Sequence, residues 1–513
     1  MIMNQHLFFR LFLLFISIQL SAQTGRSLER STPETEGLSS EVVASFISAL
    51  EQEIDAPHSL MIVKNGKVIT EAWWDPYNAQ TPHELWSLSK SFTSTAVGFA
   101  VQEGLLSIHD PVISFFPNKI PENPGWQLKQ LRVIDLLTMT TGHNKEPFPV
   151  DKDDDWVKTF LNSDIPYMPG THFMYNTPAT YMLSAIIHKI SGQKLVDYLY
   201  PRLFEPLEIE KPQWEMDPKG INTGGWGLHL KTEDIAKFGQ FYLQRGKWNG
   251  SQLLSEDWIT MATSKQVSND SNPDNDWMQG YGFQFWRSRH NTFRGDGAMG
   301  QFCLVFPDQD TVVAITSGTN NMGEIMQLTW DIILPALKEG AIPRNDQALF
   351  ALQKKIDLLR IKPVEGQTAN RKQKKWLNKK FNFNQNDQGI RSISFKAQNK
   401  EYSVQIEMEE EIQIIPYGEQ QYIKAKVKGH LPYSQTRKAS IIPKSSLRYL
   451  KNKTIASSGA WTEENEFHLR VYLYETPARM NYKFKFSDDG LILESTADHY
   501  MGFGNQVNKL NSN

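Results

Sequence analysis

Ser87 and Lys90 are the residues of this sequence whose types and spacing best suit covalent catalysis. Residues three apart on a helix lie on one face, so an amine at the later position can reach a hydroxyl at the earlier one. A serine hydroxyl becomes a strong nucleophile when a neighbouring base removes its proton. The pair therefore predicts a reaction in which Lys90 activates Ser87 and a covalent intermediate forms on the serine.

The stretch after Ser87 predicts the helix that would hold this pair. Apolar residues recur at helical intervals between Leu88 and Glu103, and Gly104 marks the end. Ser87 then stands at the amino end, where free backbone amides and the positive end of the helix dipole stabilise an oxyanion. Burial and the same dipole lower the pKa of the Lys90 amine from about 10.4, so it can act as a base near neutral pH.

Ser191 and Lys194 repeat the same spacing in a different context. Gly192 lies between them and is typical of the end of a helix. We interpret this second copy as a solvated turn.

The composition describes an ordinary soluble globular protein. Hydrophobic residues make up 40% of the 513 residues, charged residues make up 22%, and the net charge is -3. This length predicts two domains with ample material for a core. There is no basic excess that would indicate nucleic acid as a partner, and no apolar stretch beyond the amino terminus predicts a membrane span. The only cysteine, Cys303, lies in an apolar run and is interpreted as a buried strand residue.

The amino terminus carries a predicted export signal. Arg10 precedes the apolar run Leu11–Leu20, and the small residues Ser21 and Ala22 offer a cleavage site. We therefore expect residues 1–22 to be a signal peptide and the protein to be exported, either periplasmic or secreted. The alternative is an uncleaved signal anchor, for which the apolar run is short.

The pattern of residues 30–345 predicts a single domain with an α+β fold. A hairpin with the turn Asn65-Gly66 precedes Ser87, a largely helical region follows, and strands then return. One antiparallel sheet flanked by helices, with an inserted helical region, accounts for strands at both ends. We expect helices at 41–53, 131–138, 180–190, 195–203, 232–245 and 323–337, a hairpin at 59–74, and strands at 282–287, 293–295, 301–306 and 311–317.

The rest of the sequence predicts a linker over residues 346–380 and an all-β domain over residues 381–513, either a small sandwich or a barrel. Short alternating stretches support the β domain, at 392–396, 402–407, 413–416, 422–427, 468–474 and 482–486. The linker holds a basic run, which we interpret as a solvated helix face, with an anionic-ligand site as the alternative. Its members are Arg371, Lys372, Lys374, Lys375, Lys379 and Lys380.

Five sequence blocks in order give residues 30–345 a resemblance to a known family. The blocks are Trp86–Phe92, Leu136–His143, Pro169–Thr177, Gly224–Leu228 and Asp234–Gly239. They resemble the serine β-lactamase and penicillin-binding-protein family, and most closely its class C β-lactamase and esterase branch. The Ser-x-x-Lys of Ser87 and Lys90 is the first of the three motifs that define the site of this family.

The resemblance implies that the second motif, Tyr-x-Asn, falls on Tyr175, Asn176 and Thr177. A phenol beside a cationic lysine has a lowered pKa, and it can relay a proton between Ser87 and the leaving group. Without the family, Tyr175 would be read as a core aromatic residue with a bonded hydroxyl. Thr177 departs from the family's asparagine, which weakens the expectation of penicillin-like recognition. Asn176 is adjacent, but a neighbour in sequence usually points elsewhere.

The resemblance also implies that the third motif falls on Asp296, Gly297 and Ala298. Small residues there let a substrate approach, and the Met299 amide would be the second oxyanion donor beside that of Ser87. A carboxylate now stands where the family offers a cation to the substrate carboxylate. Like charges about 4 Å apart cost on the order of 1 to 4 kcal/mol, so we expect neutral or cationic esters or amides as substrates. The alternative is that Asp296 pairs with Arg294 or another cation and never meets substrate.

These residues predict a serine hydrolase that needs no cofactor and acts on a small-molecule or short-peptide acyl group. His143, His172 and His188 show no zinc-ligand spacing and are interpreted as surface or loop residues. One alternative is a sensor or pseudoenzyme that is acylated without turnover, or that binds peptidoglycan or glycan. Another places the function in the β domain, as a glycan or lipid binder, although Trp461, Tyr472, Tyr474 and Tyr482 alternate as core residues would.

Overall fold

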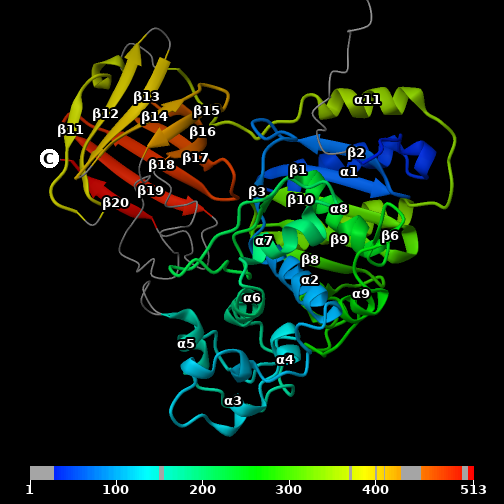
Figure 1. Cartoon of the computed structure of the whole chain (residues 1–513). Coiled ribbons are helices and arrows are strands. Elements are labelled where there is room, and N and C mark those ends of the chain that lie inside the picture. Colours follow the sequence, from blue (N-terminus) through cyan, green and yellow to red (C-terminus); the bar gives the residue numbers. More distant parts are fainter. Residues whose placement is uncertain are drawn as a thin grey trace, which may run out of the picture.

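A computed structural model of the chain describes residues 28–149, 155–368, 373–386, 388–398, 401–409, 411–428, 452–498 and 507–512. The predicted signal peptide, and Arg371 and Lys372 of the basic run, lie outside these ranges. Figure 1 shows an α+β part and a β-rich carboxyl-terminal part side by side. The predicted fold class, an antiparallel sheet with helices followed by an all-β region, is confirmed.

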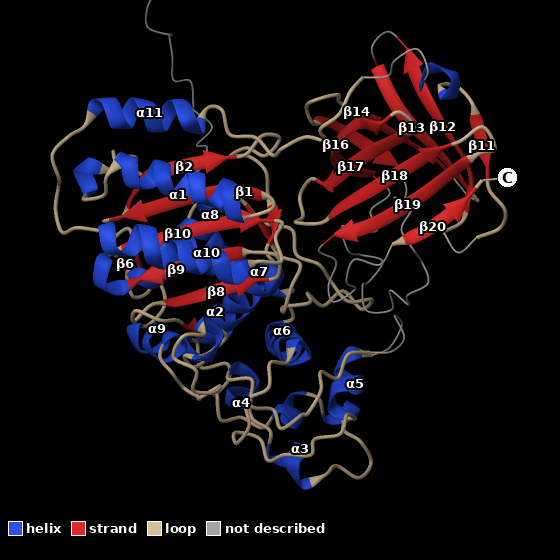
Figure 2. Ribbon diagram, turned by 180° about the vertical axis from the view of Figure 1, so that it is seen from behind, coloured by secondary structure: helices blue, strands red, loops and turns tan. Residues whose placement is uncertain are grey.

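A six-stranded antiparallel sheet forms the centre of the first part, in the order β2-β1-β10-β9-β8-β7. Figure 2 shows β2, β1, β10, β9 and β8 of this sheet. The strands are β1 (Pro57–Lys64), β2 (Lys67–Trp73), β7 (Trp286–Arg287), β8 (Phe293–Gly297), β9 (Gln301–Phe306) and β10 (Thr311–Ser317). Met61 and Val63 pack into the core on one face, whereas Leu60 and Ile62 pack into the core on the other. Because both faces are covered, these strands are continuous apolar runs instead of alternating ones.

Helices cover the two faces of this sheet and build the insert between β2 and β7. Helices α1 and α10 contribute to the core on one face, and α2 and α8 contribute to the core on the other. The helices are α1 (Ser40–Glu53), α2 (Ser89–Gln102), α3 (Trp126–Gln130), α4 (Val133–Leu137), α5 (Trp156–Leu161), α6 (Thr177–Ser191), α7 (Leu195–Leu199), α8 (Thr232–Leu243), α9 (Glu256–Thr263) and α10 (Met322–Leu328). Two short strand pairs lie within the insert as separate two-stranded sheets. They are β3 (His83–Glu84) with β4 (His229–Leu230) and β5 (Lys247–Trp248) with β6 (Ser251–Gln252).

Two predicted elements are shorter than expected. The strand predicted at 282–287 is reduced to Trp286 and Arg287, because Gln284 has a φ of 63° and interrupts the extended backbone. The helix predicted at 323–337 ends as an α-helix at Leu328 and continues through irregular helical turns to Ala336. Pro335 lies in the last of these turns and lacks the N–H that a regular helix requires.

A helix occupies much of the predicted linker. Helix α11 (Asp346–Ile356) begins at Asn345, whose side chain accepts a hydrogen bond from Ala348 N at 3.0 Å. Lys355 forms an ion pair of 2.8 Å with Glu51 of α1. The first third of the linker is therefore an ordered helix against α1, with a capped start and with Ala348 and Leu352 buried.

The β-rich part is a meander of antiparallel strands in two sheets of four and six strands. Isolated bridges join the sheet edges at Gly418 and Ser458 and at Phe383 and Ser512, so the described strands close into a barrel. The strands are β11 (Lys380–Asn382), β12 (Ile390–Gln398), β13 (Glu401–Met408), β14 (Ile412–Tyr417), β15 (Ile423–Lys428), β16 (Asn452–Glu463), β17 (Glu466–Leu473), β18 (Arg479–Phe486), β19 (Leu491–Asp498) and β20 (Asn508–Asn511).

The aromatic residues weighed as a binding surface are buried. Trp461 and Tyr482 lie in the barrel core, with exposed fractions of 3% and 1%. Tyr472 and Tyr474 instead join the core that contains α1 and one face of the central sheet. Buried rings cannot stack on a glycan, so these residues act as core residues. In the described part of the basic run, Lys375 pairs with Asp488 and Lys380 pairs with Glu407, both at the surface.

Within the part of the chain that the structure describes, no helix combines the length and the apolar character needed to cross a bilayer.

Candidate active site

Ser87 lies in a single 3-10 turn (Trp86–Leu88) that runs directly into α2. The Lys90 amine donates hydrogen bonds of 2.9 Å to Ser87 Oγ and 2.9 Å to the Gly225 carbonyl. Lys90 is 1% exposed, whereas Ser87 is half-buried and open to a substrate. The predicted contact between nucleophile and base is thus present, and Gly225 supplies a second acceptor that orients the amine.

Burial lowers the pKa of Lys90 to about 7. The negative charges of Glu146 and Asp296 oppose this shift, since each favours the protonated amine. An amine with this pKa is half neutral near pH 7, and the neutral form can take the Ser87 proton. The expectation of a lowered lysine pKa is confirmed, with burial as the cause.

Gly225 must be a glycine for reasons of space. A Cβ atom built there would lie 2.7 Å from Thr177 Cγ2 and 3.6 Å from Lys90 Nζ. Real side chains do not tolerate the first distance, so a larger residue would displace the loop whose carbonyl holds Lys90. This explains the glycine pair in the block Gly224–Leu228.

Tyr175 lies beside Ser87 and Lys90, as predicted. Lys90 Nζ is 4.9 Å from the centre of its ring, and the ring stacks on Trp286 at a centroid distance of 5.4 Å. The expected direction of its pKa is wrong. Burial raises the pKa of Tyr175 well above its usual value, the charge of Asp296 raises it further, and a hydrogen bond with Ser87 only partly offsets these effects. The phenol therefore keeps its proton near neutral pH.

The side chains of Asn176 and Thr177, from the second motif, point in different directions at the start of α6. Asn176 is buried and caps the helix, because its side chain accepts from Ala179 N at 3.1 Å. Thr177 instead faces Gly225. The expectation that Asn176 points away from the site is confirmed.

Glu146 is a site residue that the sequence reasoning missed. Its exposed carboxylate accepts a hydrogen bond from Thr177 N at 2.6 Å and acts electrostatically on both Lys90 and Tyr175. It lies 59 positions after Ser87 and outside any motif. Only its place three residues beyond the block Leu136–His143 could have drawn attention to it.

The third-motif strand β8 passes directly beside the serine turn. A Cβ at Gly297 would overlap the Leu85 carbonyl and lie 3.1 Å from Trp86 Cβ, so glycine is needed for the close approach. Asp296 is 6% exposed and accepts hydrogen bonds from Arg294 Nε at 2.9 Å and Trp277 Nε1 at 3.0 Å. The alternative that Asp296 pairs with Arg294 is thus present in the structure, although the carboxylate still acts on Lys90 and Tyr175.

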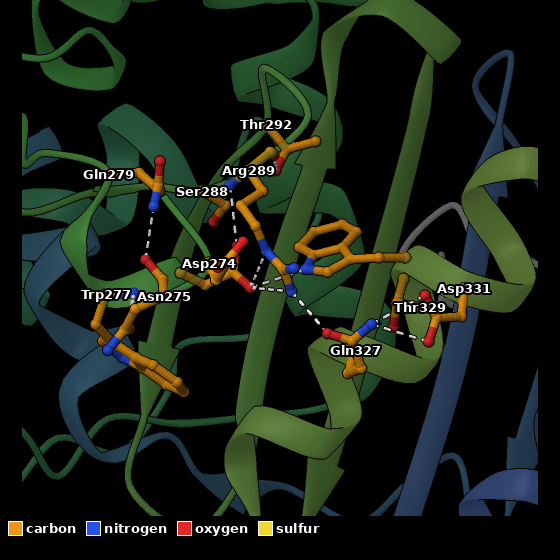
Figure 3. A network of polar contacts seen from close by, with 12 residues as sticks. Asp274, Asn275, Trp277, Gln279, Ser288, Arg289, Thr292, Gln327, Thr329 and Asp331 are labelled. Carbon is orange, nitrogen blue, oxygen red and sulfur yellow. Dashed lines mark hydrogen bonds and ion pairs between the residues drawn. The ribbon is translucent and has the colours of Figure 1, made fainter. Parts of the chain in front are cut away.

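Figure 3 shows a polar network that fixes the segment carrying Trp277. Arg289, between β7 and β8, donates to Asp276 Oδ2 at 3.0 Å. It also donates to Gln327 Oε1 at 2.9 Å (Figure 3). Gln327 belongs to α10, so the network ties three segments together. Trp277 follows Asp276 directly and is held where its indole can reach Asp296.

Ala298 and Met299 lie in the turn between β8 and β9. Met299 has a φ of 66°, and its carbonyl accepts from Ser317 Oγ at 2.9 Å and from Thr319 N at 3.1 Å. Ala298 is half-buried. The turn is therefore anchored to the end of β10, which fixes the backbone next to the predicted oxyanion donor.

The remaining candidates lie elsewhere. Ser191 ends α6, with Gly192 in the left-handed conformation after it, and its hydroxyl donates to Ile187 O, as a solvated turn requires. Cys303 is buried in β9, and burial raises its pKa to about 12. His172 and His188 lie at the surface or in loops. His143 is a loop residue but buried, because Thr141 and Ser163 satisfy both ring nitrogens.

Comparison with known proteins yields a match to the family model described as Beta-lactamase over residues 48–338. A relative named 6-aminohexanoate-dimer hydrolase, from Paenarthrobacter ureafaciens, is 22% identical over 55% of this chain and 78% of its own. A β-lactamase of Escherichia coli strain K12 is 25% identical over 35% of this chain and 48% of its own.

Among solved structures, one described as a candidate 6-aminohexanoate-dimer hydrolase from Bacillus anthracis has a TM-score of 0.51 and 19% identity. The match covers 61% of this chain and 87% of that one. At this identity the likeness concerns the fold.

Proposed function

The chain belongs to the β-lactamase family, and from this premise we propose that it is a serine hydrolase that cleaves esters or amides through an acyl-enzyme intermediate. The observation that carries the proposal is the 2.9 Å hydrogen bond between Lys90 Nζ and Ser87 Oγ, made by an amine whose pKa is about 7. A nucleophile in contact with a neutral base is the minimum that acyl transfer requires.

In the first step, Ser87 Oγ bonds to the substrate carbonyl carbon while its proton passes to Lys90. The carbonyl π electrons move to the oxygen, and the amides of Ser87 and Met299 stabilise this oxyanion. The turn anchored by Ser317 and Thr319 supports the placement of the second amide.

In the second step, the tetrahedral intermediate collapses and the bond to the leaving group breaks. Tyr175 gives its proton to the departing oxygen or nitrogen and regains one from the Lys90 ammonium. The raised pKa of Tyr175 supports this role, since a protonated phenol is a donor and relay. Water then releases the acyl group by the reverse path, so that the proton balance closes.

The charges around the site support neutral or cationic substrates. Glu146 and Asp296 both act on Lys90, and Arg294 pairs with only the second of them. A substrate carboxylate would meet this negative field, whereas an ammonium group would be attracted. The relative named for hydrolysis of a 6-aminohexanoate dimer supports a small acyl substrate.

A substrate panel tests the proposal. Short-chain esters, D-amino-acid amides and a chromogenic cephalosporin are incubated with the wild type, Ser87→Ala and the matched control Ser191→Ala. We expect ester or amide cleavage that the control retains and Ser87→Ala loses, with little cephalosporin turnover. Full activity of Ser87→Ala would refute the mechanism, and fast cephalosporin hydrolysis would refute the charge argument.

Thr177, in place of the family's asparagine, favours a second candidate function. The Thr177 side chain that faces Gly225 is shorter than an asparagine side chain. If this difference slows deacylation enough, the protein acts as an acylated sensor or as a peptidoglycan-binding pseudoenzyme. Burst kinetics decide between the two. A stoichiometric burst without turnover supports the sensor, and continuous turnover supports the hydrolase.

Export is the remaining part of the proposal and depends on residues 1–22. Fractionation of cells that express the full chain tests it, with the mature amino terminus expected near Gln23. Recovery of the uncleaved chain in the cytoplasm would overturn this part alone.

A further inference from the structure

The turn between β17 and β18, residues 474–478, reaches out of the barrel and contacts the α+β part. Tyr474 donates a hydrogen bond to the Pro76 carbonyl at 2.8 Å and shares one of 2.7 Å with Thr81. The Glu475 carbonyl accepts from Glu84 N at 2.9 Å. These contacts fall on the segment that leads into the catalytic turn.

Strand β3 makes one of these contacts and leads directly into the segment that carries Ser87. Glu84 belongs to β3 and stands three residues before Ser87. The next residue, Leu85, donates its N–H to Leu228 O at 2.8 Å, and its carbonyl packs against Gly297 of β8. The backbone that sets the position of Ser87 N is thus held between the barrel turn, the loop after Gly225 and the third-motif strand.

The same turn also supports the second predicted oxyanion donor. A Cβ at Gly318 would lie 2.8 Å from the Pro477 carbonyl, so the two backbones are in direct contact. The adjacent Thr319 donates to the Met299 carbonyl at 3.1 Å. One turn of the barrel therefore lies behind both segments whose amides the mechanism uses.

A stack of buried rings makes this contact rigid. Tyr77 lies between Tyr474, at 5.1 Å, and His58, at 4.0 Å, with both pairs nearly parallel. His58 in turn hydrogen-bonds His83 of β3 at 2.9 Å. All four residues are at most 7% exposed, so movement of the barrel turn would disrupt a packed core.

We propose that the β17–β18 turn is a positioning element of the catalytic site, which holds the Ser87 and Met299 backbones in the geometry that acylation needs. The proposal rests on the proposed serine hydrolase function. It assigns the barrel a role in catalysis that acts through the backbone of these two segments. The physical reason is that a displacement of about 1 Å at a reacting centre can cost about a hundredfold in rate.

Two conservative variants test the turn, each with a matched control in the same barrel. Tyr474→Phe removes the hydroxyl that binds Pro76 and Thr81 but keeps the ring, and Tyr402→Phe, in β13, is its control. Thr476→Val removes a hydroxyl that bonds Leu473 O and Ala478 N. Its control is Ser487→Ala, which removes the corresponding hydroxyl from the β18–β19 turn.

For each variant we measure kcat, KM, the rate at which a phosphonate probe labels Ser87, and the midpoint of unfolding. We expect kcat and the labelling rate of both turn variants to fall about tenfold, with KM within about twofold, equivalent to about 1.4 kcal/mol of barrier. The two controls should keep wild-type kcat. Lower activity that simply tracks the unfolding midpoint would overturn the proposal, as would wild-type kcat in both turn variants.

The outcome is separable from that of the proposed function. If wild-type protein neither turns over substrate nor labels at Ser87, the hydrolase proposal fails and the positioning role fails with it. If the wild type is active and only the turn variants behave like their controls, the hydrolase proposal stands and the positioning role alone is refuted.

Discussion

Lys90 determines how the reaction of Ser87 should respond to pH. The amine must be neutral to accept the serine proton, and burial places its pKa at about 7. We expect kcat/KM to fall as the pH drops through about 7, because the protonated amine cannot act as the base. A pH–rate profile with a neutral ester measures this. A profile that stays flat from pH 5 to about 9 would contradict Lys90 as the base.

A variant of Glu146 tests whether the fall of this pH–rate profile at low pH, its acid limb, reports the protonation of Lys90. The Glu146 carboxylate raises the pKa of Lys90, so Glu146→Gln should move the acid limb to lower pH. Glu256→Gln, at the surface with Arg245, is the matched control and should leave the limb in place. An equal shift in both variants would indicate an effect of net charge instead of a local one.

The residues of the first and second motifs could be predicted from the sequence, but their environment could not. Ser87, Lys90 and Tyr175 are brought together as expected. The direction of the Tyr175 pKa was wrong because burial depends on Trp286 and other residues far away in the chain. Glu146 was missed for the same reason, since neither periodicity nor spacing marks a loop carboxylate that meets a helix start.

Strand β8 combines close backbone approach with a buried ion pair. Arg294 is fully buried and its partner Asp296 is 6% exposed. Removal of one member of such a pair leaves the other charged and desolvated. Arg294→Met should therefore lower the free energy of unfolding by about 3–5 kcal/mol, measured by denaturant unfolding.

The matched control for this prediction is an exposed pair. Arg344 and Asp346 have side chains that are 79% and 70% exposed. Arg344→Met should change the unfolding free energy by less than about 1 kcal/mol. A loss of similar size in both variants would argue against burial as the source of the effect.

Gly225, in the loop between α7 and β4, is predicted to be important for activity. Gly225→Ala should lower kcat/KM by about tenfold or more, because the new methyl group collides with Thr177 and displaces the carbonyl that holds Lys90. Gly125→Ala is the control, since its Cβ would have 3.6 Å to the nearest atom. Equal activity of the two variants would show that the loop yields without effect on the amine.

The elements were predicted well where a pattern is long and regular. Helix α2 and the β1–β2 hairpin follow from helical spacing and from the Asn65-Gly66 turn, whose residues have φ angles of 53° and 77°. The strand predicted at 282–287 failed because a short apolar run fits a buried loop equally well. Helix α11 was missed because its apolar stripe is narrow and half exposed.

The α+β part and the β-rich part share a buried core, so they are not two independent domains. Tyr422, Tyr472 and Tyr474 of the β-rich part share a buried core with Trp74 and Tyr77 of the α+β part. The sequence indicated a boundary but not this shared core, because the alternation of β17 shows that a side chain is buried without showing which partner buries it.

The shared core predicts cooperative unfolding. Calorimetry of the protein should give one transition, with the calorimetric and van't Hoff enthalpies in agreement. Tyr472→Ala should lower the midpoints of far-UV and tryptophan-fluorescence unfolding together, because it opens a cavity in the core common to both parts. Ile412→Ala, at a site that is 62% exposed, is the control. Two separable transitions in the wild type would contradict the prediction.

Cys303 has a practical consequence for spectroscopy. It is the only cysteine, it is 2% exposed, and its pKa is raised to about 12. Maleimide reagents attack thiolates, so the native chain should resist alkylation while folded. A single new cysteine at the exposed Lys374 could then carry a fluorophore without prior removal of the native thiol, and would report whether the barrel shifts relative to the tryptophans near Ser87.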